Sequence, residues 1–537
     1  MSIRGEKTFC DPGERQSRRN VSAGKLICWG MEKDFIHSRP GIQGGGAIGG
    51  NSFELEGCID RMRPFLICSS KEKCIFMATQ TTQHTSGLTS DATEFSRDVT
   101  LFGGISILAG IMIGSGVFYL GSYVLIRSGM SMGLALIVWI VGGLVTLLSG
   151  LCYAELGTMM PKAGGGYVYL REAFGERVAY MSGMSTFIIG SSGSIAGLAI
   201  ALPQALTSIF PMTELQCKLF AVLMVVLLTA VNYRGVKFGA AIQNVFMIGK
   251  LIPLVLIIIC GIAMGQQTPD LTPVPAGGAS IGEILSMVAF GVVATLWAFE
   301  GWTNLNTISE EIQEPRKNIP RAIIISILAV TALYVLFNFS IYRVLSFEDI
   351  SAHIAAGDYF LGTAAANTLF GHYGKIFVAI AMAVAIFGAL NGSVMVFPRT
   401  YYAMAKDGMF FPSVTKLHPK YHTPTGAIIA SMIVSCLLIF ANNLDQITSL
   451  VVFSGMIFKS LTFASVIVLR KKYPDMNRPY KVWFYPFSVY LIVLVMIGLC
   501  LNTLLEDPRT SLIGLIVPLF GLAVYEFQLR RKKKASR

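Results

Sequence analysis

Long apolar runs alternate with short polar stretches along most of this chain. A helix that spans a membrane needs about 20 mainly apolar residues. The chain contains twelve runs near or above this length, so the pattern predicts an all-α membrane protein with twelve transmembrane helices. The predicted spans are 101–126, 132–157, 178–209, 217–233, 239–264, 281–308, 319–345, 373–402, 425–441, 446–469, 483–504 and 510–529.

The composition supports a membrane protein over a soluble one. Hydrophobic residues make up 53% of the chain and charged residues 14%, whereas a typical soluble domain carries about 25% charged residues. The net charge of +12 would suggest a nucleic-acid partner in a soluble protein. Basic residues of membrane proteins instead collect in cytoplasmic loops that face anionic lipid. We therefore expect the lipid bilayer, and no nucleic acid, as a partner.

The distribution of Lys and Arg predicts the orientation of the spans. With the N-terminus inside, most basic residues fall in inner loops and the C-tail, including Arg399 and the cluster at 530–534. This asymmetry predicts a multi-pass protein of the cell membrane with both termini cytoplasmic. The outer loops receive only Arg127, Lys218, Arg343, Lys375 and Arg509.

Three regions follow from this pattern. Residues 1–97 are polar and rich in glycine, so we expect a disordered cytoplasmic tail there. Residues 1–76 are also consistent with upstream sequence wrongly assigned to the gene, with Met77 as the start. The membrane-spanning domain is expected at 98–530, followed by a basic cytoplasmic tail at 531–537.

The first predicted span contains Gly114, Ser115 and Gly116 in the middle of an apolar run. Glycine costs roughly 1 kcal/mol in a helix interior relative to alanine, so this cluster favours a break. A break frees backbone N–H groups that lipid cannot satisfy but a bound anion can. The alternative is a face of small residues for close helix packing, and the cluster alone does not decide between the two.

The sixth predicted span contains a second such stretch, with Trp297, Phe299, Glu300 and Gly301. An ionisable group at this depth costs at least about 2.5 kcal/mol and usually faces a cavity or a partner. Freed carbonyls here would suit an ammonium group, as freed N–H groups in the first span suit a carboxylate. Together they describe a site for an α-amino acid. The spacing of the two breaks predicts that spans 1–5 and 6–10 are inverted repeats.

Two lysines lie deep inside predicted spans. Lys250 falls in the middle of the fifth span and Lys459 in the tenth, too central to reach water easily. Lys250 could hold the first broken helix to its neighbours in place of a sodium ion, or could belong to a buried structural pair. Lys459 could pair with Glu300. The chain has no H-E-x-x-H, C-x-x-C or phosphate-binding loop motif, so we expect no enzyme activity, no cofactor and no metal.

Six motifs, in order, resemble the L-type amino-acid transporter branch of the amino acid–polyamine–organocation superfamily. The resemblance covers roughly residues 97–530, and it implies a LeuT-like fold with a 5+5 inverted repeat. It also implies sodium-independent transport of L-α-amino acids, commonly by exchange. The motifs are Gly114-Ser-Gly116, Tyr153-Ala-Glu-Leu-Gly157, Pro161-Lys-Ala-Gly-Gly-Gly-Tyr167, the sixth span through Arg316-Lys-Asn-Ile-Pro320, Phe387-Gly-Ala-Leu-Asn-Gly392 and His418-Pro-Lys-Tyr-His-Thr-Pro424.

The resemblance also implies roles for single residues. Backbone amides of Ser115 and Gly116 would hold the substrate carboxylate, and the carbonyls of Met112 and Trp297 its amino group. Trp297 would also cover the site. Gly455 and Met456 would line the side-chain pocket, and Lys250 matches a lysine of this branch near the sodium position of sodium-coupled relatives. Large-neutral transporters have glycine where this chain has Glu300, whereas a cystine and dibasic exchanger has aspartate, so the substrate stays open.

One departure from the family bears on partners. Animal members carry a cysteine in the outer loop between helices 3 and 4 that is disulfide-linked to a glycoprotein. The corresponding loop here runs from Thr207 to Cys217 and has no cysteine in its middle. This argues against a covalent heavy-chain partner. Two other functions stay open: a proton-coupled symporter of amino acids or polyamines, and an amino-acid sensor without net flux.

Overall fold

The computed structural model describes residues 88–89, 93–114, 116–207, 209–275, 277–371, 373–506 and 508–535, so the predictions for residues 1–76, Met77 and Ser115 lie outside the described residues. Helices dominate, and the described residues form no strand, only an isolated bridge between Val99 and Ile312. The elements are α3 (Leu101–Met112), α4 (Gly116–Arg127), α5 (Met132–Met159), α6 (Gly166–Phe174), α7 (Glu176–Ser185), the π-helix η3 (Thr186–Gly190), α8 (Ser191–Leu206), α9 (Glu214–Tyr233), α10 (Val236–Met264), α11 (Ile281–Ala298), α12 (Asn304–Thr307), η4 (Ser309–Glu311), α13 (Pro315–Val344), α14 (Phe347–Ala355), α15 (Leu361–Phe370), α16 (Tyr373–Val396), α17 (Pro398–Lys406), η5 (Pro412–Thr415), α18 (Thr425–Ala441), α19 (Leu444–Lys472), α20 (Phe487–Glu506) and α21 (Pro508–Ala535).

The helix lengths agree with a multi-pass membrane protein. Ten helices or helix segments of the described chain are long and apolar enough to cross a membrane, and the pair α3 and α4 adds an eleventh span. A shorter apolar helix, α18, coincides with the ninth predicted span. The all-α multi-pass fold is thus confirmed, whereas the total of twelve spans and the inverted repeat stay predictions.

The first predicted span is interrupted where the glycines indicated. α3 ends at Met112, α4 begins at Gly116, and the two helices are bent by 54°. The Thr100 side chain accepts a hydrogen bond from the Gly103 amide and so caps the N-terminus of α3. The break therefore lies between two well-formed helical halves.

The sixth predicted span is interrupted as well. α11 begins with a capping box between Ser280 and Glu283 and ends at Ala298. Turn residues follow as far as the short helix α12, and Gly301 in this turn has φ +129°. Only glycine adopts such a conformation without strain, so the sequence fixes the break at this point.

The third predicted span contains a π-helical segment. η3 joins α7 and α8 within one continuous span from Glu176 to Leu206, near the predicted bounds of 178–209. π-Helical segments are rare in proteins, and those that occur often lie at functional sites. Thr186 and Gly190 of η3 line the central cavity described below.

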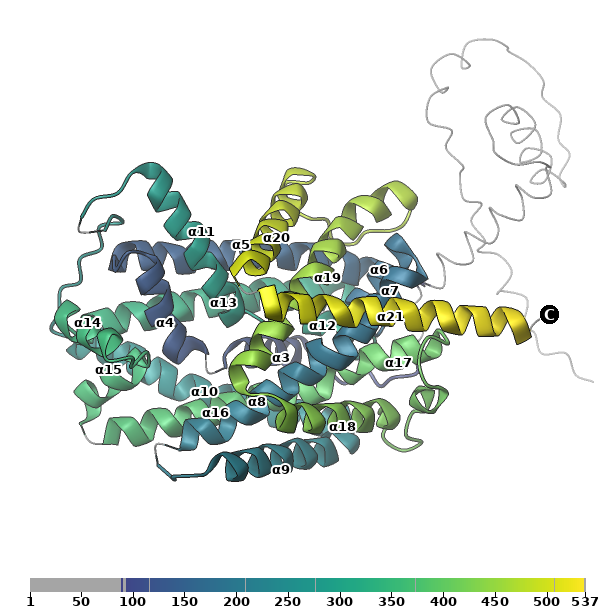
Figure 1. The fold of residues 1–537 in the computed structure, drawn as a ribbon, viewed down its shortest axis with the longest axis horizontal. Coiled ribbons are helices and arrows are strands. Elements are labelled where there is room, and N and C mark those ends of the chain that lie inside the picture. The colour runs from purple at the N-terminus through teal and green to yellow at the C-terminus, as the bar shows by residue number, and fades with distance from the viewer. Residues whose placement is uncertain are drawn as a thin grey trace, which may run out of the picture. The chain divides into compact units, whose positions relative to one another are not determined.

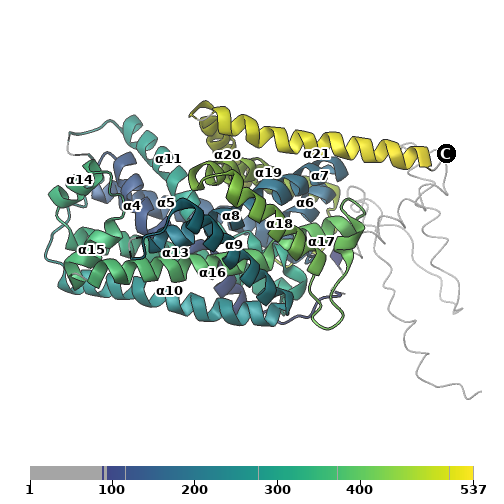
Figure 2. The ribbon, with the colours of Figure 1, turned by 60° about the horizontal axis from the view of Figure 1, so that its bottom comes forward.

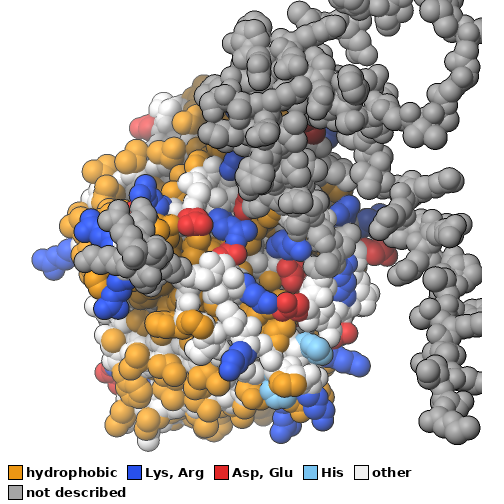
Figure 3. All heavy atoms as spheres, turned by 90° about the vertical axis from the view of Figure 1, so that its right-hand side faces the viewer, with side chains coloured by type: hydrophobic (Ala, Val, Ile, Leu, Met, Phe, Trp, Pro, Cys, Tyr) orange, Lys and Arg blue, Asp and Glu red, His pale blue; other side chains and the backbone are white. Residues whose placement is uncertain are grey.

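The helices pack lengthwise, with α5 along α13 and α10 along α16. The short helices α14 and α15 lie at one end of this bundle, and α6 and α17 lie at the opposite end (Figure 1 and Figure 2). Figure 3 shows Lys, Arg, Asp and Glu side chains on the face at the second end, with hydrophobic side chains along its flanks. On the flank formed by α9, Leu219 and Leu223 are exposed, as expected of side chains that face lipid.

Candidate functional site

A cavity of about 600 Å³ lies between the two broken spans, α8 and α19. It brings together most of the site residues that the sequence predicted, although these are far apart in the chain. The predicted residues on its wall are Met112, Gly114, Gly116, Trp297, Glu300, Gly301, Gly455 and Lys459.

Phe299 and Met456 were also predicted to bind substrate, but they lie behind this wall. Phe299 is fully buried and packs its ring against Trp139 and Tyr334. Met456 is buried. It follows Gly455 on α19, and Gly455 shares its face of the helix with Lys459, four residues further on. Neighbouring residues of a helix or turn point in different directions, so a contiguous motif cannot place all its side chains in one cavity.

One hydroxyl group connects the two breaks. The Tyr334 hydroxyl of α13 lies 2.8 Å from the Met112 carbonyl oxygen and 2.9 Å from the Ala298 carbonyl oxygen. These carbonyls belong to the C-terminal ends of α3 and α11, which have no helical partner there. The sequence analysis missed Tyr334, although a tyrosine inside an apolar span was a usable signal.

The backbone at both breaks is tightly packed. A side chain at Gly301 would collide with Ile111, 2.7 Å away, and would crowd the backbone nitrogen of Met112. By contrast, nothing lies within 4 Å of the position that a side chain at Gly114 would take. The break of the sixth span therefore presses against the first, whereas Gly114 opens onto the cavity.

The two carbonyls predicted to bind an amino group already have internal donors. The Met112 carbonyl accepts from the Gly114 amide at 2.9 Å, and the Trp297 carbonyl accepts from the Glu300 amide at 3.0 Å. Each has a second donor nearby as well: the Tyr334 hydroxyl for Met112, whose single proton can instead go to the Ala298 carbonyl, and the Phe299 amide for Trp297. A ligand amino group would thus share these acceptors with the protein.

Lys250 lies at the break of the first span. Its side chain is 1% exposed, and its nitrogen donates to the carbonyls of Gly110 at 2.6 Å and Ile113 at 2.8 Å. It also donates to the Ala385 carbonyl of α16 at 3.0 Å. One side chain from α10 therefore ties the end of α3 to α16, as the sequence analysis suggested for this lysine.

The predicted pairing of Lys459 with Glu300 is confirmed. The Lys459 nitrogen of α19 donates to Glu300 Oε2 at 2.5 Å. Both side chains keep some exposure, 19% for Lys459 and 38% for Glu300, and both line the cavity. The pair therefore faces the space where a ligand would bind.

Aromatic residues line the cavity towards α14 and α15. Trp297 and Tyr119 of α4 both line this part of the cavity. One turn further on, the Tyr123 ring stacks on Tyr359, with ring centroids 4.8 Å apart. The Ser122 hydroxyl donates to the Tyr359 carbonyl at 2.6 Å. These contacts join the second half of the first span to the segment between α14 and α15.

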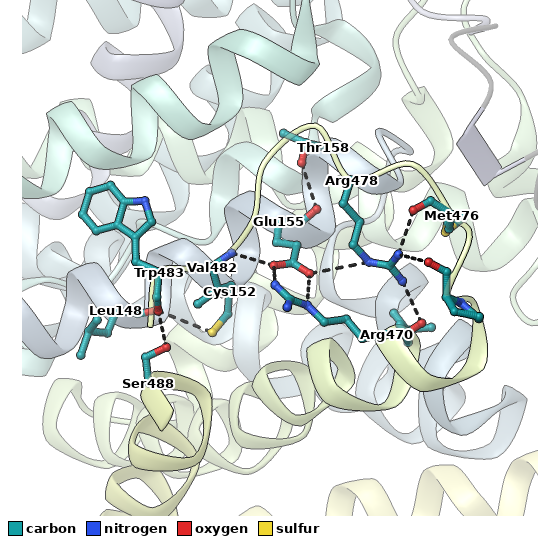
Figure 4. A network of polar contacts seen from close by, with 12 residues as sticks. Leu148, Cys152, Glu155, Thr158, Arg470, Met476, Arg478, Val482, Trp483 and Ser488 are labelled. Atoms are coloured by element: carbon teal, nitrogen blue, oxygen red, sulfur yellow. Dashed lines mark hydrogen bonds and ion pairs between the residues drawn. The ribbon is translucent and has the colours of Figure 1, made fainter. Parts of the chain in front are cut away.

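An ionic network ties helices together at the opposite end of the bundle (Figure 4). The buried Glu155 carboxylate of α5 accepts two hydrogen bonds from Arg470 of α19, at 2.8 and 2.6 Å. It also accepts from the Val482 amide at 2.7 Å, and Arg478 lies 3.8 Å away. The loop between α19 and α20 is thereby fixed to α5. Glu155 lies in the Tyr153–Gly157 motif, but the sequence alone indicated no role for it.

A second, fully buried ion pair lies at this end. Arg399 of α17 donates to both oxygens of Glu311 at the end of η4, at 2.7 and 3.3 Å. The side chains are 1% and 2% exposed. Arg399 was expected in an inner loop, but the structure places it in a helix against the end of the sixth span. The sequence around a charged residue near the end of an apolar run does not show whether a buried side chain of opposite charge lies beside it.

The segment before α3 joins this region. The Val99 amide donates to the Glu311 carbonyl at 3.0 Å, and the Thr93 hydroxyl donates to Glu310 at 2.9 Å. Glu94 accepts hydrogen bonds from Lys406 and Tyr402 of α17, each at 2.8 Å, and these bonds lower the pKa of its carboxyl. The chain just before the first span is thus bound to the ends of the sixth and eighth spans.

Within the described ranges, no group of three or more His, Cys, Asp or Glu side chains is placed to hold a metal ion. The five described cysteines, among them Cys217, are free thiols.

Comparison with protein families gives one match that covers most of the chain. Residues 99–521 match the amino acid permease family. These residues include both broken spans and every described residue of the cavity wall.

Individual proteins are similar over nearly the same range. The chain is 33% identical over 440 residues to the serine/threonine exchanger SteT of Bacillus subtilis (strain 168), which covers 81% of this chain and 98% of that protein. It is 31% identical over 440 residues to the human cystine/glutamate transporter, covering 80% and 85% of the two chains. It is 33% identical over 435 residues to the human large neutral amino acids transporter small subunit 2, covering 80% of each.

Proposed function

This chain belongs to the amino acid permease family, and on that premise we propose that it is a sodium-independent exchanger of L-α-amino acids in the cell membrane. The observation that carries the proposal is the meeting of two interrupted spans at one cavity. Such breaks in transporters offer backbone groups to a substrate at mid-membrane depth. The names of the similar proteins, an exchanger among them, agree with this function.

The two ends of an amino acid would bind to different breaks. The substrate carboxylate would lie at the N-terminus of α4, where Ser115 and Gly116 would supply backbone amides. Its amino group would share the carbonyls of Met112 and Trp297. Gly114 supports this placement because the space beside it is open to the cavity.

Sodium independence is supported by the position of Lys250. A sodium ion at the break would need several oxygen ligands, and the carbonyls of Gly110 and Ile113 are natural candidates. Both carbonyls already accept hydrogen bonds from the Lys250 nitrogen. This side chain therefore does the work of a bound cation and leaves transport independent of sodium.

Exchange requires that the cavity opens to one side of the membrane at a time. Trp297 and Tyr119 would close it towards α14 and α15, which we place on the outer side. The pairs Arg399–Glu311 and Arg470–Glu155 would hold the opposite, cytoplasmic side. Both termini would then be cytoplasmic, as the distribution of basic residues predicts.

Proton-coupled symport is the second candidate, because the ionisable Glu300 lines the cavity. The two functions differ in what drives uptake. An exchanger needs an amino acid on the far side of the membrane, whereas a symporter responds to a pH gradient. An amino-acid sensor would show neither response.

Counterflow in proteoliposomes tests the proposal. Vesicles loaded with unlabelled amino acid should take up labelled amino acid in sodium-free buffer, and empty vesicles should not. A panel of neutral, dibasic and acidic amino acids would identify the substrate. Uptake into empty vesicles that follows an imposed pH gradient would instead identify a symporter, and absence of uptake in every arm would contradict a transport function.

We also propose that no covalent heavy chain is attached. The loop between α8 and α9 contains no cysteine, and Cys217 is buried in the first turn of α9. The protein from a native membrane should therefore migrate identically with and without reductant. A reductant-sensitive band of higher mass would contradict this.

A further inference from the structure

The cavity wall carries one positive and one negative side chain in direct contact. Glu300 lies in the turn after α11 and Lys459 in the middle of α19, and their charged atoms are 2.5 Å apart. Both line the cavity and both remain partly exposed. An ion pair with a purely structural role is usually covered by neighbouring side chains. This pair is exposed to the cavity, so it can contact a ligand there.

The pair lies where a substrate side chain would project. The Lys459 side chain runs back along α19, and its nitrogen is 3.8 Å from the position of a side chain at Gly455. Because Gly455 has no side chain, the ammonium group occupies this part of the wall. Glu300 is three residues after Trp297, so the pair is next to the proposed amino-group site.

The two groups keep free hydrogen-bonding capacity. The contact uses one carboxylate oxygen of Glu300 and one donor of Lys459. A carboxylate has two acceptor oxygens and an ammonium group three donors. A ligand hydroxyl or amide could therefore donate to Glu300 and accept from Lys459 while the ion pair stays intact.

The charges of the pair also cancel. A cationic ligand side chain attracted to Glu300 would meet Lys459, and an anionic one attracted to Lys459 would meet Glu300. Juxtaposed like charges are strongly unfavourable in a site of low dielectric. A side chain with a single charge therefore gains from one partner and loses to the other, whereas a neutral polar side chain has no such penalty.

We propose that Glu300 and Lys459 form a selectivity pair that directs this transporter to α-amino acids with neutral polar side chains. Lys459 acts as a built-in counter-charge that prevents Glu300 from selecting dibasic substrates. Glu300 in turn prevents Lys459 from selecting acidic ones. This inference rests on the proposed function and adds the substrate class to it.

The test is competition in the counterflow assay, with L-serine, L-lysine and L-glutamate as labelled substrates. Wild-type protein should prefer serine. Lys459→Gln leaves an unpaired carboxylate and should raise the ratio of lysine to serine uptake about tenfold or more. Glu300→Gln leaves an unpaired ammonium and should raise the ratio of glutamate to serine to a similar extent.

The double variant Glu300→Gln/Lys459→Gln separates charge from structure. It should return to the wild-type preference because the wall is again neutral. The reversed pair Glu300→Lys/Lys459→Glu should behave similarly, and it keeps an ion pair if the single variants are unstable. Lys317→Gln is the matched control, because Lys317 pairs with Glu314 at 2.6 Å on the exposed surface, and no ratio should change.

Ratios on one preparation do not depend on how much protein is inserted, so they report selectivity. If wild-type protein exchanges amino acids but all variants reduce the three substrates equally, the selectivity pair is refuted and exchange stands. If wild-type protein prefers lysine or glutamate, the selectivity pair is refuted as well. If wild-type protein transports none of the three nor any other amino acid, the proposed function itself fails.

Discussion

The side-chain nitrogen of Lys250 lies 2.6 Å from the carbonyl oxygen of Gly110, in the last turn of α3. Carbonyls at a helix end lack partners within the helix, and lipid cannot supply them. Lys250 supplies donors to two such carbonyls and links them to α16 through Ala385. The first broken helix is thus held in place by a side chain of α10.

Lys250→Met should therefore impair exchange without preventing insertion. It leaves buried carbonyls without a donor, which costs about 1–3 kcal/mol for each group. We expect counterflow to fall at least about tenfold at equal amounts of reconstituted protein. Lys375→Met is the control, because Lys375 is an exposed lysine on α16 and its loss should change little. Wild-type activity in Lys250→Met would show that the break needs no cation.

Gly301→Ala should disrupt the contact between the two breaks. Gly301 has φ +129°, and a side chain there would collide with Ile111 and crowd the backbone of Met112. Gly278→Ala provides a matched control, since Gly278 also has a positive φ of +74° but has nothing within 4 Å. Positive φ alone costs roughly 1–3 kcal/mol in either variant. Only Gly301→Ala should lose ligand binding, measured as the shift in melting temperature that serine produces. Equal behaviour of the two variants would refute the steric argument.

Gly114→Leu should abolish uptake of labelled amino acids while leaving surface expression intact. The space beside Gly114 is open to the cavity, so a leucine fits structurally but occupies the place of the substrate carboxylate. Gly114→Ala should have a smaller effect, because one methyl group fills less of the cavity. Gly498→Leu is the control, since Gly498 is exposed on α20 and has nothing within 4 Å. Normal uptake by Gly114→Leu would place the substrate elsewhere.

The sequence predicted the breaks and the charges at depth because each leaves a local signal. Glycine and polar residues inside apolar runs indicated the interruption before Gly116 and the one at Gly301. Glu300 and Lys459 stood out because a charge inside a span needs a partner, and depth alone suggested that they pair. These features are visible without knowledge of which helices are neighbours.

The contacts that the sequence analysis missed depend on helix packing. Tyr334 is one tyrosine among many in apolar spans, and only the packing of α13 against α3 and α11 gives its hydroxyl two carbonyl partners. Arg399 looked like a loop residue because the apolar run ends nearby, whereas its partner Glu311 comes from another span. The sequence also could not show whether the Phe299 side chain points into the cavity or away from it, because the conformation of the turn after α11 determines this. The local sequence pattern therefore locates the site in the chain but does not identify the residues that other helices contribute to it.

The buried pair of Arg399 and Glu311 should be essential for stability. Removing one partner leaves an uncompensated buried charge, at a cost of about 3–5 kcal/mol. We expect Arg399→Leu to lower the melting temperature of the purified protein by about 5 °C or more. Arg177→Leu is the matched control, because Arg177 pairs with Glu526 at 2.8 Å on the surface, where such pairs contribute at most about 1 kcal/mol. Equal shifts for the two variants would contradict the argument.

The N-terminal tail distinguishes a transporter from a sensor that signals through it. The contacts that tie the tail to the helix bundle include those of Thr89 with Arg316 and of Thr93 with Glu310, both after Met77. A chain that starts at Met77 retains these contacts, so its counterflow should match that of the full chain within about twofold. A chain that starts at Leu101 loses them together with the bond between Val99 and Glu311, and its activity should fall. If removal of residues 1–76 alone changes amino-acid binding or flux, the tail takes part in function and the sensor hypothesis gains support.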